Sequence, residues 1–305
     1  AGTTLGFAVG RPDTPVRRRA TAWVAGLVAG SSFALLMSLA PGVFAGQTLL
    51  QHAEWVPAIG LNANFRLDAL GWMFASLISG IGLLIILYAA YYLHHDDPAG
   101  KFFATLMLFM AAMLGIVLSD NLILLLVFWE LTSISSFLLI GYWGGREESR
   151  TGARMALAIT GGGGLVMLAG IVVLGQIGGS FDLSVLLTKG AEIQAHPLYP
   201  VALATMVKAG LFMMMRLYPV LGGTALFEGV VASVGLATMV FAAFVAMFKH
   251  DLKGLLAYST VSHLGLITFL IGLGSPLSAV VAVFHILNHA AFKAALFMSA
   301  GIVDH

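Results

Sequence analysis

Long runs of apolar residues, separated by short polar stretches, extend along almost the whole chain. A hydrocarbon core about 30 Å thick is crossed by about 20 residues of α-helix, and nine of the runs come close to that length or exceed it. These runs are residues 21–46, 69–93, 102–119, 121–143, 155–177, 199–218, 222–248, 254–274 and 276–302. Because the connections are short, we expect an all-α, polytopic transmembrane bundle of about nine hydrophobic helices, with residues 1–305 forming a single transmembrane domain.

The composition agrees with a membrane protein that has no soluble domain. Hydrophobic residues make up 59% of the chain and charged residues only 10%, whereas soluble domains carry about 25% charged residues. The net charge of +1, without a basic patch, gives no indication of nucleic-acid binding. Cysteine is absent, which excludes disulfides, thiol nucleophiles and cysteine metal sites. We expect neither a cofactor nor enzymatic chemistry.

Positive charges give the bundle an orientation, because cytoplasmic loops are enriched in Lys and Arg. If the arginines of residues 11–19 are cytoplasmic, those of residues 146–154 are cytoplasmic as well. Counting onward places Arg216 inside but Lys249 and Lys253 outside, against the rule. One further span between about residues 190 and 205 would return both lysines to the cytoplasmic side.

Two ionisable residues fall deep inside predicted spans, where a charge costs about 2.5–3.5 kcal/mol. Glu130 is the tenth residue of the 121–143 span, and hydroxyl residues follow it at positions 132–136. Lys208 lies at a similar depth in the 199–218 span. We interpret Glu130 as a proton or cation site and Lys208 as its possible partner in a pKa switch. A structural ion pair at Glu130, and a Lys208 that reaches along a tilted helix to the surface, are the alternatives.

The last span carries a polar stripe. His285, His289 and Lys293 are four residues apart, so they share one face of a helix, and His263 lies on the preceding span. An imidazole can accept a proton on one nitrogen and donate from the other, which suits a proton relay.

Two other patterns are given less weight. A metal site on the histidines is not expected, since Lys293 would repel a cation. Lys249, His250 and Lys253 form an interfacial cluster that either anchors a helix end or serves as a gate to water.

The stretch from Phe128 to Gly141 closely resembles the fifth-helix motif of the large A subunit of Mrp-type multisubunit sodium/proton antiporters. The stretches 250–265 and 284–298, together with residues 65–68 and 119–121, resemble other parts of the same protein, and the likeness covers nearly all of residues 50–305. The membrane subunits of respiratory complex I are relatives of the same family.

The resemblance implies roles for individual residues. Glu130 matches the family's essential membrane glutamate, and Lys208 matches the lysine of the following relay. His263 and Lys293 match polar groups of the central hydrophilic axis. It also implies a location in the bacterial inner membrane, with other membrane subunits, lipid, H⁺ and Na⁺ as partners.

The chain departs from the family in one region. Where the family has a broken helix with its own lysine, residues 199–205 run directly into the helix of Lys208. We therefore expect a missing segment near 199–205, visible as a chain break or an over-long step within residues 199–206. The chain also begins without Met and ends directly after an apolar run, so we expect the C-terminal part of the family's large subunit to be missing.

These observations predict an ion-translocating subunit of a Na⁺/H⁺ antiporter that moves protons along Glu130, Lys208, His263, His285, His289 and Lys293. A proton-pumping membrane subunit of a complex I-like oxidoreductase and an inactive membrane fragment are the alternatives.

Overall fold

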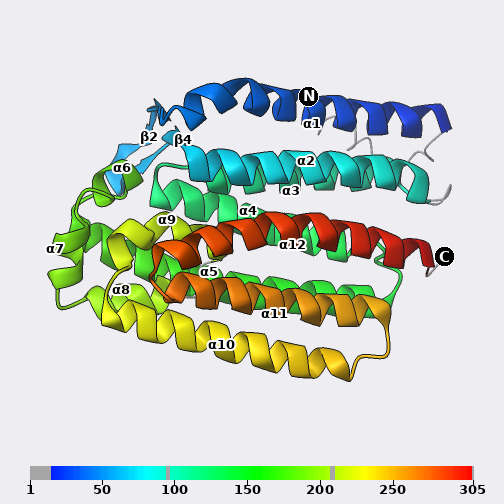
Figure 1. Ribbon diagram of the computed structural model, residues 1–305. Coiled ribbons are helices and arrows are strands. Elements are labelled where there is room, and N and C mark those ends of the chain that lie inside the picture. The colour runs from blue at the N-terminus through cyan, green and yellow to red at the C-terminus, as the bar shows by residue number, and fades with distance from the viewer. Residues whose placement is uncertain (1–14, 94–96, 207–209, 304–305) are drawn as a thin grey trace. The chain divides into compact units, whose positions relative to one another are not determined.

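The computed structural model describes residues 15–93, 97–206 and 210–303, with the side chains described from residue 19 onward. Within these ranges, eight helices are long and apolar enough to cross a membrane. Figure 1 shows the arrangement of the long helices within the chain. They are α1 (Pro15–Phe44), α2 (Ala69–Tyr92), α3 (Ala99–Leu118), α4 (Leu122–Ile140), α5 (Glu147–Gly178), α10 (Ala225–Met247), α11 (Leu252–Gly272) and α12 (Pro276–Val303). The predicted all-α transmembrane fold is confirmed.

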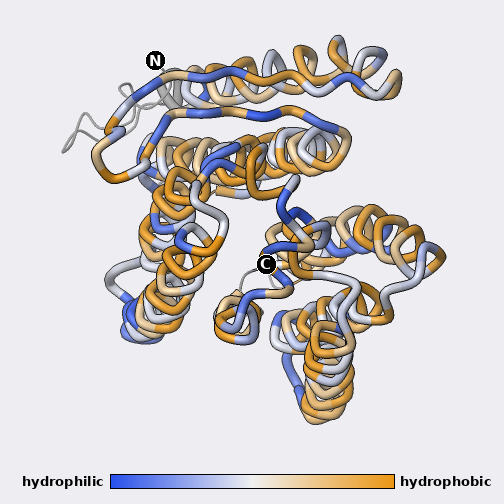
Figure 2. Tube along the Cα trace, turned by 90° about the vertical axis from the view of Figure 1, so that its left-hand side faces the viewer, coloured by the Kyte–Doolittle hydropathy of each residue, from blue (hydrophilic) through white to orange (hydrophobic). Residues whose placement is uncertain are grey.

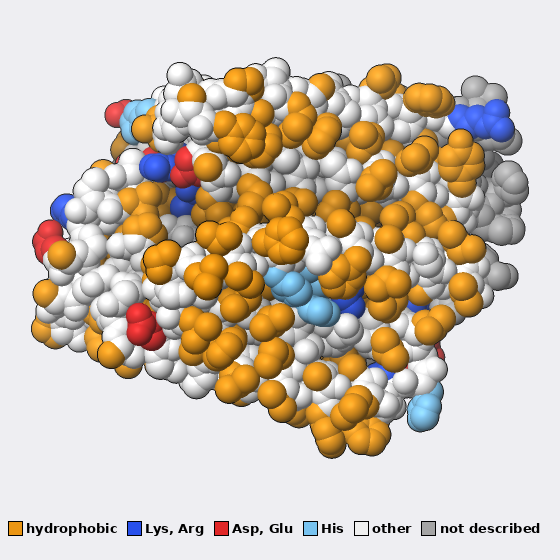
Figure 3. Space-filling model, in the orientation of Figure 1, with side chains coloured by type: hydrophobic (Ala, Val, Ile, Leu, Met, Phe, Trp, Pro, Cys, Tyr) orange, Lys and Arg blue, Asp and Glu red, His pale blue; other side chains and the backbone are white. Residues whose placement is uncertain are grey.

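The distribution of hydrophobic residues agrees with a bundle of membrane-spanning helices. Figure 2 shows the long helices coloured mostly as hydrophobic, and in Figure 3 hydrophobic side chains cover most of the visible helix surface. Large apolar side chains such as Phe241 on α10 and Phe284 on α12 are each 68% exposed. Exposure of this kind is expected where the surrounding solvent is lipid rather than water.

Contacts divide the chain into two compact units. The first contains Ala1–Ile171 and Ser180–Ser184, and the second contains Val172–Gly179 and Val185–His305. Helix α5 begins in the first unit and ends in the second.

In the first unit, α1, α2 and α3 share an apolar core. Small residues of α1, Ala25 and Ala29, are buried in the same cluster as Ile86 and Ala89 of α2 and Phe103 of α3. Small side chains allow helices to approach closely, which is the usual way of packing helices in a membrane.

The polar stretch before α2 forms four short strands. Strand β1 (Leu49–Gln51) pairs antiparallel with β4 (Phe65–Leu67), and β2 (Glu54–Val56) with β3 (Leu61–Asn62). A single 3₁₀ turn, η1 (Pro57–Ile59), joins β2 to β3.

In the second unit, α10 and α11 pack backbone against backbone through glycines. A Cβ added at Gly265 would lie 2.5 Å from the backbone nitrogen of Met239, and one added at Gly235 would lie 2.7 Å from the Cα of Phe269. Gly272 similarly faces the backbone of Ala232. These positions bring α11 close to α10 and fix which face of α11 remains for α12.

The segment predicted as a span over 199–218 has a different form. It contains two short helices, α8 (Tyr199–Met206) and α9 (Leu211–Leu221). The Tyr199 hydroxyl, at the start of α8, donates to the carbonyl of Leu221, at the end of α9, over 2.6 Å. Gln194 of α7 (Gly190–Ala195) also donates to the carbonyl of Val220. The first and last residues of the segment therefore lie side by side, so the segment is a hairpin.

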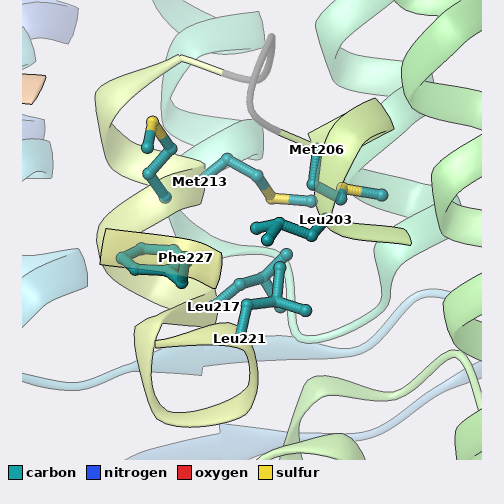
Figure 4. A pocket seen from close by; sticks show the side chains of 7 residues that line it. Leu203, Met206, Met213, Leu217, Leu221 and Phe227 are labelled. Carbon is teal, nitrogen blue, oxygen red and sulfur yellow. The ribbon is translucent and has the colours of Figure 1, made fainter. Parts of the chain in front are cut away.

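Apolar side chains hold the two short helices together. Figure 4 shows Leu203 and Met206 of α8 beside Met213 and Leu217 of α9, around a small pocket. Phe227, at the beginning of α10, also lines the pocket.

Neither helix of the hairpin is long enough to cross a membrane by itself. Its helices of 8 and 11 residues are about 12 and 16 Å long at 1.5 Å per residue, about half of the 30 Å hydrocarbon core. A segment that enters by one short helix and returns by the other is re-entrant.

The expected chain break within 199–206 is wrong, because Tyr199–Met206 is a continuous helix in which the amide of Ala202 donates to the carbonyl of Leu198. Arg216, which the sequence analysis placed on the inside, is buried in the structure. It is 4% exposed and lies over the ring of Phe212.

A re-entrant hairpin would remove the conflict with the charge rule. If α5 and α10 each cross the membrane once and the hairpin does not cross, the loop that contains Lys249 and Lys253 is expected on the cytoplasmic side, as the positive-inside rule requires. The missing segment near 199–205 remains a prediction.

Cysteine labelling tests this topology, and the chain has no native cysteine to interfere. We expect Ala195→Cys and Ala225→Cys, on either side of the hairpin, to react with a membrane-impermeant maleimide from the same side of the membrane. Glu148→Cys and His250→Cys should react from the opposite side; all four positions are exposed. Labelling of Ala195→Cys and Ala225→Cys from opposite sides would show that residues 199–221 cross the membrane.

Candidate functional site

Glu130 lies in the middle of α4 and its side chain is half-buried. The neighbouring hydroxyls do not donate to it. Thr132 and Ser133 donate to the carbonyl of Trp129, and Ser135 donates to the carbonyl of Leu131. These hydroxyls bond to the backbone of their own helix.

The Glu130 carboxyl instead lies against the backbone of α5. A Cβ added at Gly164 would overlap one carboxyl oxygen of Glu130 and would lie 2.9 Å from its carboxyl carbon. Lys208, the predicted partner of Glu130, is outside the described residues, so that pairing remains a prediction.

Three histidines gather between α11 and α12. His263 Nδ1 of α11 and His285 Nε2 of α12 are 3.0 Å apart, which is a hydrogen bond whose donor depends on the tautomers. The ring of His289 lies 5.0 Å from that of His263 and 6.2 Å from that of His285, centre to centre. In Figure 3, histidine side chains are visible between these two helices.

Burial increases along the stripe of α12. His285 is half-buried, His289 is 8% exposed and Lys293 is 5% exposed. Lys293 Nζ donates to the backbone carbonyl of Leu256 on α11 over 3.1 Å. The His289 Nε2 atom is buried and has no hydrogen-bond partner among the described residues.

The structure thus brings the three predicted histidines of α11 and α12 together, with Lys293 one turn beyond His289 on α12 and bonded to α11. Each imidazole can accept a proton at one nitrogen and release one from the other, and the Lys293 amine can do so at its single nitrogen. The cluster has the chemistry for passing protons over short distances inside an apolar unit. The described residues contain no group of three or more His, Cys, Asp or Glu side chains placed to hold a metal ion.

The predicted gate residues lie at the turn between α10 and α11. Lys249 Nζ lies 4.8 Å from the centre of the Tyr258 ring, and His250 and Lys253 are exposed. Asp251 caps α11 by accepting from the amide of Gly254. The gate role of Lys249, His250 and Lys253 remains a prediction.

A buried polar network in the first unit was missed by the sequence analysis, in which residues 119–121 appear only as part of the family resemblance. Asn121 is fully buried. Its amide donates to the carbonyl of Gly60 over 2.9 Å and to the Asp182 carboxylate over 2.8 Å. Its oxygen accepts from the amides of Ile123 and Leu124, which caps α4.

The same network contains further polar side chains. Asn64 donates to the Asp182 carboxylate over 2.9 Å, and Arg66 Nη1 lies 3.8 Å from Asp120 Oδ1. Burial raises the pKa of Asp120, while a hydrogen bond with Ser184 and the charge of Arg66 oppose that rise. The network joins the reversal before α4 to the strands and to the loop after α5.

Comparison with known protein families gives two matches. Residues 119–198 and 191–305 match the family described as NADH:quinone oxidoreductase/Mrp antiporter, TM. Residues 55–103 match the family described as NADH-Ubiquinone oxidoreductase (complex I), chain 5 N-terminus.

Among curated proteins, the chain is 49% identical to the A/B subunit of a probable K(+)/H(+) antiporter of Rhizobium meliloti (strain 1021), over 95% of this chain and 32% of that protein. It is 38% identical to the A1 subunit of the Na(+)/H(+) antiporter of Staphylococcus aureus (strain bovine RF122 / ET3-1), over 90% of this chain and 40% of that protein. The chain therefore spans about a third to two fifths of the length of these relatives.

Two solved structures have a similar fold. A chain of the Mrp complex from Dietzia sp. DQ12-45-1b matches with a TM-score of 0.85 and 27% identity, over 100% of this chain and 37% of that one. A chain of the membrane-bound sulfane sulfur reductase, an archaeal respiratory membrane complex, shares the fold, with a TM-score of 0.73 and 18% identity, over 98% of this chain and 54% of that one.

The two curated relatives named above are bacterial, and eight helices of the described part of the chain are long and apolar enough to span a membrane. The chain is thus a multi-pass protein of the bacterial inner membrane, and it belongs to the NADH:quinone oxidoreductase/Mrp antiporter transmembrane family.

Proposed function

We propose that the chain is an ion-translocating membrane subunit of a multisubunit antiporter that exchanges Na⁺ for H⁺. The observation that carries the proposal is the row formed by His263, His285, His289 and Lys293, which is partly buried at His263 and His285 and buried at His289 and Lys293. Ionisable groups inside a membrane are costly, and a row of them in contact with one another marks a path for protons.

In this proposal Glu130 binds and releases the coupling proton. Its carboxylate accepts a proton to become the neutral acid and gives it up again, so no covalent bond except that to the proton is made or broken. Lys208 holds the charge of Glu130 in one state and releases it in the other. The row on α11 and α12 then passes the proton onward, from His263 and His285 to His289 and Lys293.

Sodium is proposed as the exchanged ion because the resemblance is to the large subunit of sodium/proton antiporters. The names of the curated relatives include both Na⁺/H⁺ and K⁺/H⁺ antiporters, so the ion is tested directly. The other membrane subunits of the complex are the proposed partners.

The family description also includes NADH:quinone oxidoreductase, which supports a second candidate, a proton-pumping subunit of a complex I-like enzyme. In that case the redox centres would lie in partner subunits, because this chain has no cysteine with which to hold an iron–sulfur cluster. An inactive membrane fragment is the third candidate.

One experiment on membrane vesicles distinguishes the three candidate functions. Everted vesicles that contain the chain with its co-purifying subunits are loaded with a pH-sensitive dye and given NaCl, KCl or choline chloride. We expect Na⁺ to drive proton movement, with choline inactive and no requirement for an electron donor. Proton movement that requires NADH and quinone would support the oxidoreductase, a response to K⁺ alone would overturn the choice of sodium, and no response to any addition would support an inactive fragment.

A further inference from the structure

We propose that Gly164 of α5 is a positioning residue for Glu130, because the volume that any other side chain would fill is occupied by the glutamate carboxyl. This inference rests on the proposed role of Glu130 as the proton-binding carboxylate. Gly164 is buried and lies in the middle of a regular helix, so its backbone conformation does not require glycine.

The contact is specific to one of four consecutive glycines. A Cβ added at Gly161, Gly162 or Gly163 meets nothing within 4 Å, whereas at Gly164 it overlaps the carboxyl of Glu130. A row of glycines that served only to let helices approach would be expected to face other helices at more than one position. Here the close contact is confined to the residue that touches the carboxyl.

The cost of glycine supports the same conclusion. Within a helix, glycine is less favourable than alanine by about 1 kcal/mol. A change of Gly164 to alanine would therefore stabilise α5 if the helix alone mattered. It would also force the Glu130 carboxyl away from the α5 backbone, into another rotamer or a strained one.

Displacement of a reacting group by about 1 Å can reduce a rate by up to about 100-fold. We therefore expect Gly164→Ala to lower Na⁺-driven proton exchange at least about tenfold in vesicles that contain the assembled complex. Gly163→Ala is the matched control, one residue away in the same helix, and should retain exchange within about twofold of the unchanged chain.

A second substitution distinguishes positioning from general damage to the helix. Aspartate is shorter than glutamate by one methylene group, so Glu130→Asp withdraws the carboxyl toward α4 and makes room for a methyl group on α5. Alone, Glu130→Asp should reduce exchange. Combined with Gly164→Ala it should increase exchange relative to Gly164→Ala alone, a reversal of sign that a merely structural role of Gly164 would not produce.

These experiments distinguish a failure of the positioning role of Gly164 from a failure of the proposed function. If Glu130→Gln leaves exchange intact, the role of Glu130 fails, and this inference fails with it. If Glu130→Gln abolishes exchange but Gly164→Ala behaves like Gly163→Ala, or Glu130→Asp makes Gly164→Ala worse, the positioning role alone is overturned. If Gly164→Ala fails to assemble, recovery of assembly by Glu130→Asp supports the contact, and no recovery contradicts it.

Discussion

Replacement of Glu130 by glutamine is expected to abolish sodium-driven proton exchange while the protein still inserts and assembles. Glutamine has almost the same shape but cannot bind and release a proton at neutral pH. Proton transfer by a positioned group contributes about 100- to 10,000-fold to a rate, so the loss should be at least about 100-fold. The measurement is dye-detected proton movement in everted vesicles after addition of NaCl.

Two control variants belong with this experiment. Glu130→Asp retains a carboxylate with a shorter reach and should keep part of the exchange. Glu148→Gln removes an exposed carboxylate at the start of α5 and should keep nearly all of it. Exchange at an unchanged rate in Glu130→Gln, with equal amounts of assembled protein, would contradict the central role of the residue.

The second large effect is expected on stability. Asn121→Ala removes the cap of α4, which costs about 1 kcal/mol. It also leaves the Gly60 carbonyl and the Asp182 carboxylate with one donor fewer in a buried site, which costs about 1–3 kcal/mol more. We expect a total loss of about 2–4 kcal/mol, seen as a lower midpoint of thermal unfolding in detergent.

Asn288 offers the matched control, since it is an exposed asparagine within α12. Asn288→Ala should leave the unfolding midpoint nearly unchanged. If the two variants unfolded at the same temperature, the polar network around Asn121 would not stabilise the first unit.

The sequence was sufficient to locate the long helices, because a run of about 20 apolar residues has few alternatives to a membrane span. It also placed His285, His289 and Lys293 on one face, since helical spacing alone decides that. It could not show which helix that face meets. The 3.0 Å bond between His263 and His285 follows from how α11 and α12 pack.

The hairpin shows where the same reasoning fails. Residues 199–218 are apolar and long enough to span, so length and hydropathy indicate a crossing. Two features make this segment a hairpin instead: a local break between two helices, and a contact between residues that are distant in the sequence. Gly210 begins a new helix, and the hydrogen bond from Tyr199 to Leu221 joins residues 22 positions apart.

The polar network around Asn121 and the contact between Gly164 and Glu130 could not be predicted from the sequence, for a related reason. Asn64 and Asp182 are 118 positions apart, and Asn121 and Asp182 are 61 apart. Spacing rules for helices and strands reach only a few residues. Likewise, four consecutive glycines look equivalent until the structure shows that Gly164 alone among them touches Glu130.

The hydrogen bond between His263 and His285 has a directional consequence. At 3.0 Å, one of the two nitrogens carries the shared hydrogen and the other offers its lone pair. When a proton arrives at the far nitrogen of the donor ring, the shared hydrogen shifts across and the second ring releases a proton from its own far nitrogen. The bond is then polarised in the opposite sense. If the proposed relay runs through this pair, a second proton can follow in the same direction only after both imidazoles have returned to their original tautomers, so we expect that reset, and not the hop across the 3.0 Å bond, to limit repeated transfer.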